Sequence, residues 1–137
     1  MGTIGRVGSS VLAARRRAAQ AGVEVSAPGM GILGVLARGG PLRVSLLARQ
    51  AGMVVTLTSR ELRSLEASGY IARRTSDDDG RVVVVSITPK GREAYGRLRV
   101  ASVAATADAL AGWSTADLAV LARLLSRMAD DFSAVRP

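Results

Sequence analysis

The sequence predicts a mostly helical fold of the α+β class, in which a helix-turn-helix and a small β-hairpin are flanked by longer helices at both ends. Three observations support this prediction. Apolar residues recur at steps of three and four over most of the chain, two β-prone runs flank an aspartate-rich turn, and glycine or proline marks the segment boundaries. A chain of 137 residues is about one domain long, so we expect a single domain spanning 1–137.

The N-terminal segment, 1–24, predicts an amphipathic helix that ends near Gly22. Its apolar stripe consists of Ile4, Val7, Val11, Ala14, Ala18 and Ala21. The first 23 residues contain four arginines and no acid, but the triple arginine at 15–17 follows apolar residues rather than leading them as in a secretory signal. We therefore interpret this segment as part of the mature protein.

A second helix is predicted between Ser26, which precedes Pro28 at a helix start, and the run RGGP at 38–41. Its apolar positions are Met30, Leu33, Leu36 and Ala37. Each of its three glycines weakens a helix by up to about 1 kcal/mol relative to alanine. These glycines are Gly29, Gly31 and Gly34. The helix must therefore be held by packing against the rest of the protein, or its glycines must allow another segment to approach it closely.

Two short apolar faces separated by Gly52 predict a helix-turn-helix. The first face is formed by Val44, Leu47, Ala48 and Ala51, and the second, which ends at Gly69, by Val55, Thr58, Leu62 and Leu65. On the opposite side of the second helix, hydroxyl and guanidinium groups share one face: Thr56, Ser59, Arg60 and Arg63. A plain solvated face is the ordinary alternative, but such faces normally mix in glutamate and lysine, and here Glu61 and Glu66 are expected to point elsewhere.

A β-hairpin is predicted next, because YIARRT at 70–75 and RVVVVSI at 81–87 are β-prone and flank the turn sequence SDDDG. Thr88 as N-cap and Pro89 at the first helical position then predict the start of a long helix. The inward residues of this helix are expected to be Tyr95, Leu98, Ala101, Ala105 and Ala109.

The last segment predicts another helix with a complete N-terminal cap. Ser114 is the capping residue, Asp117 closes a variant of the capping box, and Trp113 packs against Leu118. Apolar residues then follow at heptad-like spacing: Leu118, Leu121, Leu125, Met128 and Phe132. This apolar stripe could pack against the core of its own chain or against a helix of a partner chain. We favour a mixture of the two, in which the stripe contributes to dimerisation.

The composition excludes most catalytic chemistry. Because the chain has no cysteine and no histidine, disulfides, thiol sensing, the usual zinc sites and histidine bases are excluded. The acidic loop 77–79 does not fit a calcium loop either, since Thr75 and Ser86 would occupy positions that need Asp and Glu. We expect no enzyme activity, no cofactor and no metal. With no apolar run long enough for a membrane span and no export signal, we expect a cytoplasmic protein.

The formal net charge is +8, and all but one of the 19 cations are arginine, the side chain suited to phosphate and guanine. A nucleic-acid partner and an arginine-rich genome explain this composition equally well. The distribution of the charge agrees with a DNA-facing middle of the chain. Residues 25–75 contain seven Arg and two Glu, a net charge of +5, whereas residues 100–137 contain three Arg and four Asp, a net charge of −1.

From Leu47 to Gly91 the chain resembles the multiple-antibiotic-resistance regulators (MarR), a bacterial family of winged helix-turn-helix transcription factors. The resemblance is carried by LLARQAGM, TSRELRSLEASGYIARR and, most specifically, DDDGRVVVVSITPKG. It implies a homodimeric, sequence-specific DNA-binding regulator, with repression of an inverted-repeat operator as the commoner role. It also implies a helical dimerisation lobe from 1–24 and 90–134, a winged helix-turn-helix lobe from 25–89 and, in some members, release by a small aromatic ligand.

The same resemblance assigns residues to DNA. Arg81 matches the wing-tip arginine that enters the minor groove, and Asp79 matches the aspartate that braces it. Ser59 and Arg60 match the groups that approach the major groove, with Thr56 as a neighbour on the same face. The remaining arginines are expected to be phosphate clamps or solvated surface: Arg63, Arg73 and Arg74. Ligand-binding residues are unknown, since Met30, Tyr95 and Trp113 are more often core residues.

Two departures from the family pattern stand out. Arg43 and Val54 occupy positions where the family usually places Ser or Thr caps, and Gly80 replaces a second basic residue that many members carry in the wing. Losing a cap typically costs about 1 kcal/mol.

A winged-helix protein-interaction module without sequence-specific DNA binding is the alternative function.

Overall fold

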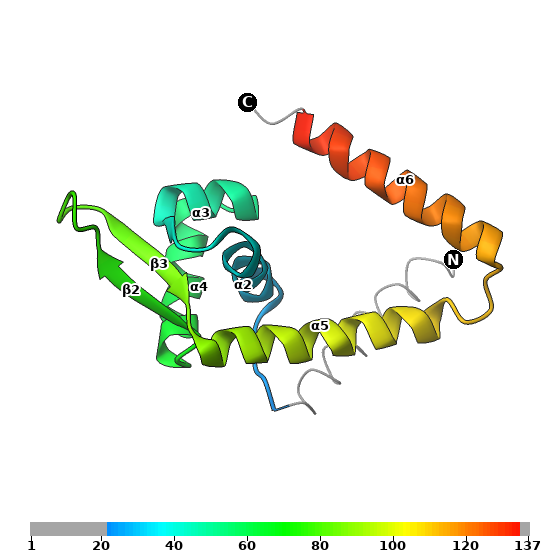
Figure 1. Cartoon of the computed structure of the whole chain (residues 1–137), viewed down its shortest axis with the longest axis horizontal. Coiled ribbons are helices and arrows are strands. Elements are labelled where there is room, and N and C mark those ends of the chain that lie inside the picture. Colours follow the sequence, from blue (N-terminus) through cyan, green and yellow to red (C-terminus); the bar gives the residue numbers. More distant parts are fainter. Residues whose placement is uncertain (1–21, 135–137) are drawn as a thin grey trace. The chain divides into compact units, whose positions relative to one another are not determined.

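The computed structural model describes residues 22–134, with the exception of the Ser133 side chain. The predicted first helix, 1–24, therefore lies almost wholly outside the described residues. The chain divides into two compact units, Met1–Ser102 and Val103–Pro137, with the boundary inside one long helix. Each unit is described by itself, with elements labelled as in Figure 1.

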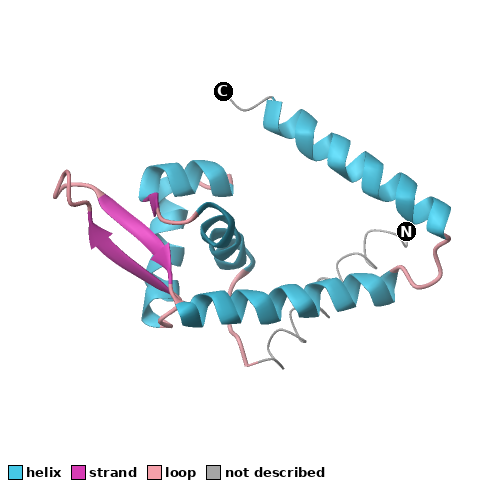
Figure 2. Ribbon diagram, in the orientation of Figure 1, coloured by secondary structure: helices cyan, strands magenta, loops and turns pink. Residues whose placement is uncertain are grey.

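The described part of the chain contains five helices and three strands (Figures 1 and 2). In order they are α2 (Ala27–Gly39), β1 (Leu42–Arg43), α3 (Val44–Ala51), α4 (Val55–Ala67), β2 (Ile71–Thr75), β3 (Val83–Ile87), α5 (Pro89–Ala109) and α6 (Thr115–Ala134). Every element predicted within this range is present, which confirms the mostly helical fold with a helix-turn-helix and a hairpin. Among these helices, none is both long and apolar enough to cross a membrane.

The sheet has one strand more than the sequence predicts. β2 and β3 form the expected antiparallel hairpin, with Ile71 opposite Ile87 and Thr75 opposite Val83. β1 pairs with the other edge of β3, so the strand order is β1-β3-β2. Two residues are too few to show a β-period, which is why the sequence did not reveal β1.

The core of the first unit surrounds α2, which contacts α3, α4 and β3 (Figure 1). Ile32, Leu33 and Leu36 are fully buried, together with Leu47, Leu62 and Val85. The predicted apolar positions of α2 were incomplete, because Ile32 and Val35 are also buried, while Met30 is partly buried and packs against the core and Ala37 is partly buried. A helix with neighbours on several sides buries more than one stripe.

Two of the three α2 glycines have the close neighbours that the sequence led us to expect. A Cβ on Gly34 would lie 3.2 Å from the Tyr95 hydroxyl, and one on Gly29 would lie 3.1 Å from Ser26 Oγ. Gly31 differs, since a Cβ there would meet nothing within 4 Å. Close approach therefore occurs at Gly29 and Gly34, while burial of Ile32, Leu33 and Leu36 supplies the packing that the sequence led us to expect as the alternative.

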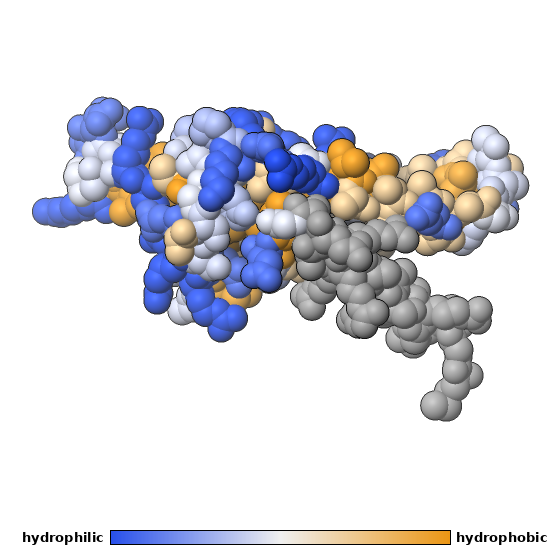
Figure 3. All heavy atoms as spheres, turned by 90° about the horizontal axis from the view of Figure 1, so that it is seen from below, coloured by the Kyte–Doolittle hydropathy of each residue, from blue (hydrophilic) through white to orange (hydrophobic). Residues whose placement is uncertain are grey.

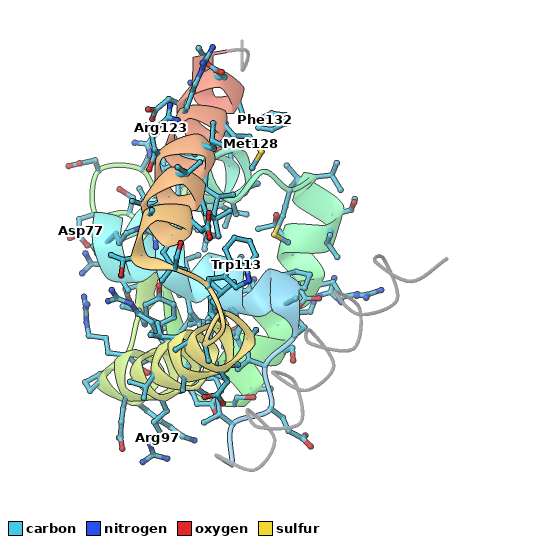
Figure 4. All side chains as sticks on the ribbon, turned by 90° about the vertical axis from the view of Figure 1, so that its right-hand side faces the viewer. Asp77, Arg97, Trp113, Arg123, Met128 and Phe132 are labelled. Carbon is cyan, nitrogen blue, oxygen red and sulfur yellow. The ribbon has the colours of Figure 1, made fainter. Side chains whose placement is uncertain are left out.

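In the second unit, α6 begins with the predicted cap. Ser114 Oγ accepts a hydrogen bond from the Asp117 amide at 3.1 Å and donates one to Asp117 Oδ2 at 2.7 Å. The carboxylate thus binds the capping hydroxyl, whereas in the standard capping box it binds the main-chain amide. Met128 and Phe132 project from one side of α6 and Arg123 from the other (Figure 4). In the single chain most of the apolar stripe is exposed, up to 68% at Phe132.

Candidate nucleic-acid interface

Helix α4 has a buried face and a polar exposed face. Its buried residues are Thr58, Glu61, Leu62 and Leu65. On the opposite side Thr56, Arg60 and Arg63 are exposed and Ser59 is partly exposed, as the helical spacing predicts. One apolar assignment was wrong: Val55 is 56% exposed, because it stands at the helix end, beyond the core.

The two helices of the helix-turn-helix begin without side-chain caps. Arg43 and Val54 occupy the N-cap positions of α3 and α4, and neither makes a side-chain capping bond. The expected loss of both caps is therefore confirmed. At α4 the Val54 carbonyl instead accepts two hydrogen bonds from Thr58, one from its amide and one from its hydroxyl, each at 3.0 Å. Gly52 closes α3 with a left-handed φ of 68°, which favours glycine.

The buried side of α4 is joined to the start of α2 through Glu61. This residue is only 9% exposed, and its Oε2 accepts a hydrogen bond from Ser26 Oγ at 2.5 Å. Ser26 Oγ also accepts from the Gly29 amide at 3.0 Å, which confirms it as the N-cap of α2. The helical spacing correctly predicts that Glu61 points away from the exposed face, but it does not reveal Ser26 as its partner, because the two residues are 35 positions apart.

The C-terminal end of α4 is joined to the start of α5. Lys90 Nζ donates a hydrogen bond to the Ser68 carbonyl at 2.8 Å and lies 5.4 Å from the centre of the Tyr70 ring. The Thr88 hydroxyl donates to the Gly69 carbonyl at 2.7 Å and accepts from the Gly91 amide at 3.0 Å. The run Thr-Pro-Lys-Gly therefore has a structural use, because its side chains bind the carbonyls that end the α4 helix.

The wing loop is held by Asp79. Its carboxylate accepts a hydrogen bond from the Arg81 amide at 3.0 Å, and its carbonyl accepts one from the Val82 amide at 2.9 Å. Asp77, Asp78, Asp79 and Arg81 are all exposed. The contact shown is thus with the main chain of Arg81 rather than with its guanidinium, and the bracing of the guanidinium by Asp79 stays a prediction.

The two arginines of β2 differ from each other. Arg73 is partly buried, with Nε 3.1 Å from Glu66 Oε2 of α4. The contact is an ion pair without hydrogen-bond geometry, since Arg73 Nε and Nη2 have no hydrogen-bond partner among the described residues. Arg74 is exposed. The expectation that Arg73 is solvated surface is therefore wrong, because its ion pair with Glu66 ties the hairpin to α4. The other expectation for Arg73, a phosphate clamp, stays a prediction.

The polar face of α4 and the wing give the first unit two hydrophilic, arginine-bearing surfaces. Hydrophilic side chains gather around the hairpin end of this unit, at the left of Figure 3. Arg60, Arg63, Arg74 and Arg81 are exposed, and none of them forms an ion pair with a carboxylate among residues 22–134. Within the same residues, no group of three or more acidic, histidine or cysteine side chains could hold a metal ion.

Residues 25–82, which contain the helix-turn-helix and the start of the wing, match the sequence model of the MarR family. This part of the chain has the sequence of a MarR-family helix-turn-helix. This confirms the resemblance drawn from the three sequence runs, and the family comprises transcription regulators rather than enzymes.

Two proteins that this chain is similar to are helix-turn-helix transcriptional regulators of Bacillus subtilis. YfiV is 34% identical over 73 residues, which cover 53% of this chain and 46% of the relative. YxaD is 32% identical over 89 residues, which cover 65% of this chain and 62% of the relative. The matched part of the chain thus spans about half to three-fifths of the length of these relatives.

Solved structures share the fold. A MarR-family regulator from Silicibacter pomeroyi is 25% identical with a TM-score of 0.68, over 95% of this chain and 84% of that one. FabT of Streptococcus pneumoniae, in complex with DNA, is 23% identical with a TM-score of 0.68, over 82% and 79%. PcaV of Streptomyces coelicolor, in complex with its natural ligand, is 22% identical with a TM-score of 0.66, over 78% and 76%. The winged helix-turn-helix architecture is therefore confirmed.

Proposed function

We propose that the protein is a homodimeric, sequence-specific DNA-binding transcription regulator that represses from an inverted-repeat operator. The observation that carries the proposal is the face of α4 that bears Thr56, Ser59, Arg60 and Arg63, which lies opposite a buried face and carries no carboxylate among these residues. The DNA complex of FabT, a protein of similar fold, supports the same use of the fold.

In this proposal α4 enters the major groove. Arg60 binds a guanine edge or a phosphate, and Thr56 and Ser59 bind bases or phosphates through their hydroxyls. Arg63 lies one turn further along the same face and binds a phosphate. The wing carries Arg81 into the adjacent minor groove, where a narrow, electronegative groove attracts guanidinium.

The dimer is proposed to use residues 1–24 and 90–134, while 25–89 form the DNA-binding lobe. The exposed apolar stripe of α6 supports this, because a second copy would remove Met128, Phe132 and their neighbours from water. Two α4 helices would then lie in successive major grooves about 34 Å apart, which requires an operator with two-fold symmetry.

A small aromatic ligand is proposed to release the repressor from DNA by favouring a different separation of the two DNA-binding lobes. The complex of PcaV with its natural ligand supports ligand control in this fold. We assign no ligand-binding residues. A repressor of this kind would act in the cytoplasm, where bacterial DNA is located.

The test is the affinity of the purified full chain for the DNA upstream of its own gene, measured by fluorescence anisotropy against a scrambled duplex. Arg60→Ala is expected to weaken specific binding by about 1 to 3 kcal/mol, because it removes a base or phosphate contact. Arg97→Ala is the matched control, since Arg97 projects from α5 (Figure 4), where it is ion-paired with Glu93, and belongs neither to α4 nor to the wing.

Equal affinity for both duplexes at physiological salt, unchanged by Arg60→Ala and Arg81→Ala, would contradict the proposal. That result would favour the alternative, a winged-helix module that binds protein through its wing and helices. Light scattering of the same samples measures whether the chain is dimeric, and loss of DNA affinity with the dimer intact supports the regulator.

A further inference from the structure

Two adjacent valines are exposed at the start of α4, next to the proposed DNA-binding residues. Val54 is 67% exposed and Val55 is 56% exposed. A single exposed apolar residue needs no explanation, but these two stand together at the end of a helix whose exposed face is otherwise polar and basic. Val54 also occupies an N-cap position, where a hydroxyl side chain would stabilise the helix and valine does not.

The position of these valines is fixed by the core. The Val54 carbonyl accepts hydrogen bonds from both the amide and the hydroxyl of Thr58, at 3.0 Å each, and Thr58 is fully buried. Val55 lies one helical turn before Ser59 and on the same side of α4. Val55 is therefore placed on the side of α4 that carries Ser59, and Val54 precedes it at a main-chain position that is hydrogen-bonded to the buried Thr58.

The charge around the valines indicates which kind of surface they meet. Arg60 and Arg63 are exposed on the same helix, so the partner surface must be anionic and must still offer apolar groups. The major groove of DNA has these two properties. The only apolar group that it presents is the C5 methyl of thymine, which is read by apolar side-chain contact.

We infer that Val54 and Val55 read thymine methyl groups in the operator half-site. This inference rests on the proposed function and adds a specificity to it: thymines lie where the start of α4 meets the groove. The uncapped start of α4 then has a use, since the side chain that would have capped the helix is replaced by one that contacts a base.

The experiment begins with selection of bound sequences from a random DNA pool by the full chain. Each thymine of the selected half-site is then replaced in turn by deoxyuridine, which lacks only the 5-methyl group, and the dissociation constant is measured. We expect one or two positions per half-site at which the replacement weakens binding about fourfold, the factor that corresponds to burial of one methyl-sized group.

The variants Val54→Ala and Val55→Ala are then measured on the same duplexes. At one of these positions, each variant is expected to bind the thymine duplex and the deoxyuridine duplex with the same affinity. Val100→Ala makes the same chemical change at a valine that is 71% exposed on α5. Because Val100 lies within the proposed dimerisation lobe, light scattering first checks that this variant is still a dimer, and the ratio of its affinities for the thymine and deoxyuridine duplexes should equal that of the wild type. Val54→Ser restores a capping hydroxyl, so it should raise the melting temperature while lowering the affinity for the thymine duplex.

A purely structural role for Val54 would change stability and affinity in the same direction, so the serine variant separates the two roles. The inference is overturned if no deoxyuridine replacement weakens binding by the wild type. It is also overturned if each replacement lowers the affinity of the wild type and of both alanine variants by the same factor. In either case the proposed function stands. If no sequence is selected at all, the proposed function itself fails.

Discussion

Ser26 Oγ donates a hydrogen bond to Glu61 Oε2 at 2.5 Å and accepts one from the Gly29 amide, in the first turn of α2, at 3.0 Å. One side chain therefore caps α2 and satisfies a carboxylate on the buried side of α4. The contact sets the position of the helix that presents the proposed DNA-binding face.

We expect Ser26→Ala to lower the free energy of unfolding by about 2 kcal/mol, measured by urea denaturation. The loss of an N-cap contributes about 1 kcal/mol, and the buried Glu61 carboxylate left without its partner contributes a similar amount. Ser64→Ala, an exposed serine on α4, should change stability by less than about 0.5 kcal/mol. The double variant Ser26→Ala with Glu61→Gln should lose less than the sum of the single losses, and strict additivity would show that the two residues do not interact.

Gly91→Ala is expected to destabilise the protein by about 3 kcal/mol or more, because the added Cβ would lie 2.0 Å from the Tyr70 carbonyl oxygen. Gly96 is a matched control on the same helix, since a Cβ there would meet nothing within 4 Å. Gly96→Ala should raise stability by up to about 1 kcal/mol through helix propensity. Thermal unfolding followed by circular dichroism measures both, and similar melting temperatures for the two variants would refute the close contact.

Asp79→Ala is expected to weaken operator binding by about 1 kcal/mol, roughly fivefold, because the hydrogen bond from the Arg81 amide is lost. Asp77→Ala should not weaken binding, although it makes the same change in charge at an exposed position of the same loop (Figure 4). Asp79→Asn separates the two possible contacts: it keeps an acceptor for the amide but removes the charge that would brace the guanidinium. If both alanine variants simply bind more tightly, Asp79 does not position Arg81.

Arg63 and Arg73 should differ in their effect on the salt dependence of DNA binding. Arg63 is exposed, so Arg63→Ala should reduce the slope of log affinity against log salt by about 1, as expected for one lost phosphate contact. Arg73 is ion-paired with Glu66, so Arg73→Ala should leave the slope unchanged and act mainly on stability. Anisotropy titrations at several salt concentrations measure the slopes, and equal reductions in both variants would place Arg73 on the phosphate backbone.

Long-range partners explain most of the features that the sequence did not reveal. β1 has only two residues and exists through its pairing with β3. Arg73 looked like a free cation because nothing local indicates that Glu66 lies beside it. Lys90, the single lysine of the chain, gave no signal in the sequence, yet it binds the end of α4. In each case the partner is brought close by the fold and not by neighbouring sequence positions.

The sequence by itself determined the succession of helices and hairpin, their starting caps at Ser26, Thr88 and Ser114, and the polar face of α4. These features follow from local spacing, since side chains three and four positions apart share a helix face whatever the rest of the chain does. Only the tertiary structure decided which polar residues face inward and which are paired. Burial of Glu61 against Ser26 and the contact of Gly91 with Tyr70 depend on segments that are distant in sequence, and their positions are set by packing of the whole core.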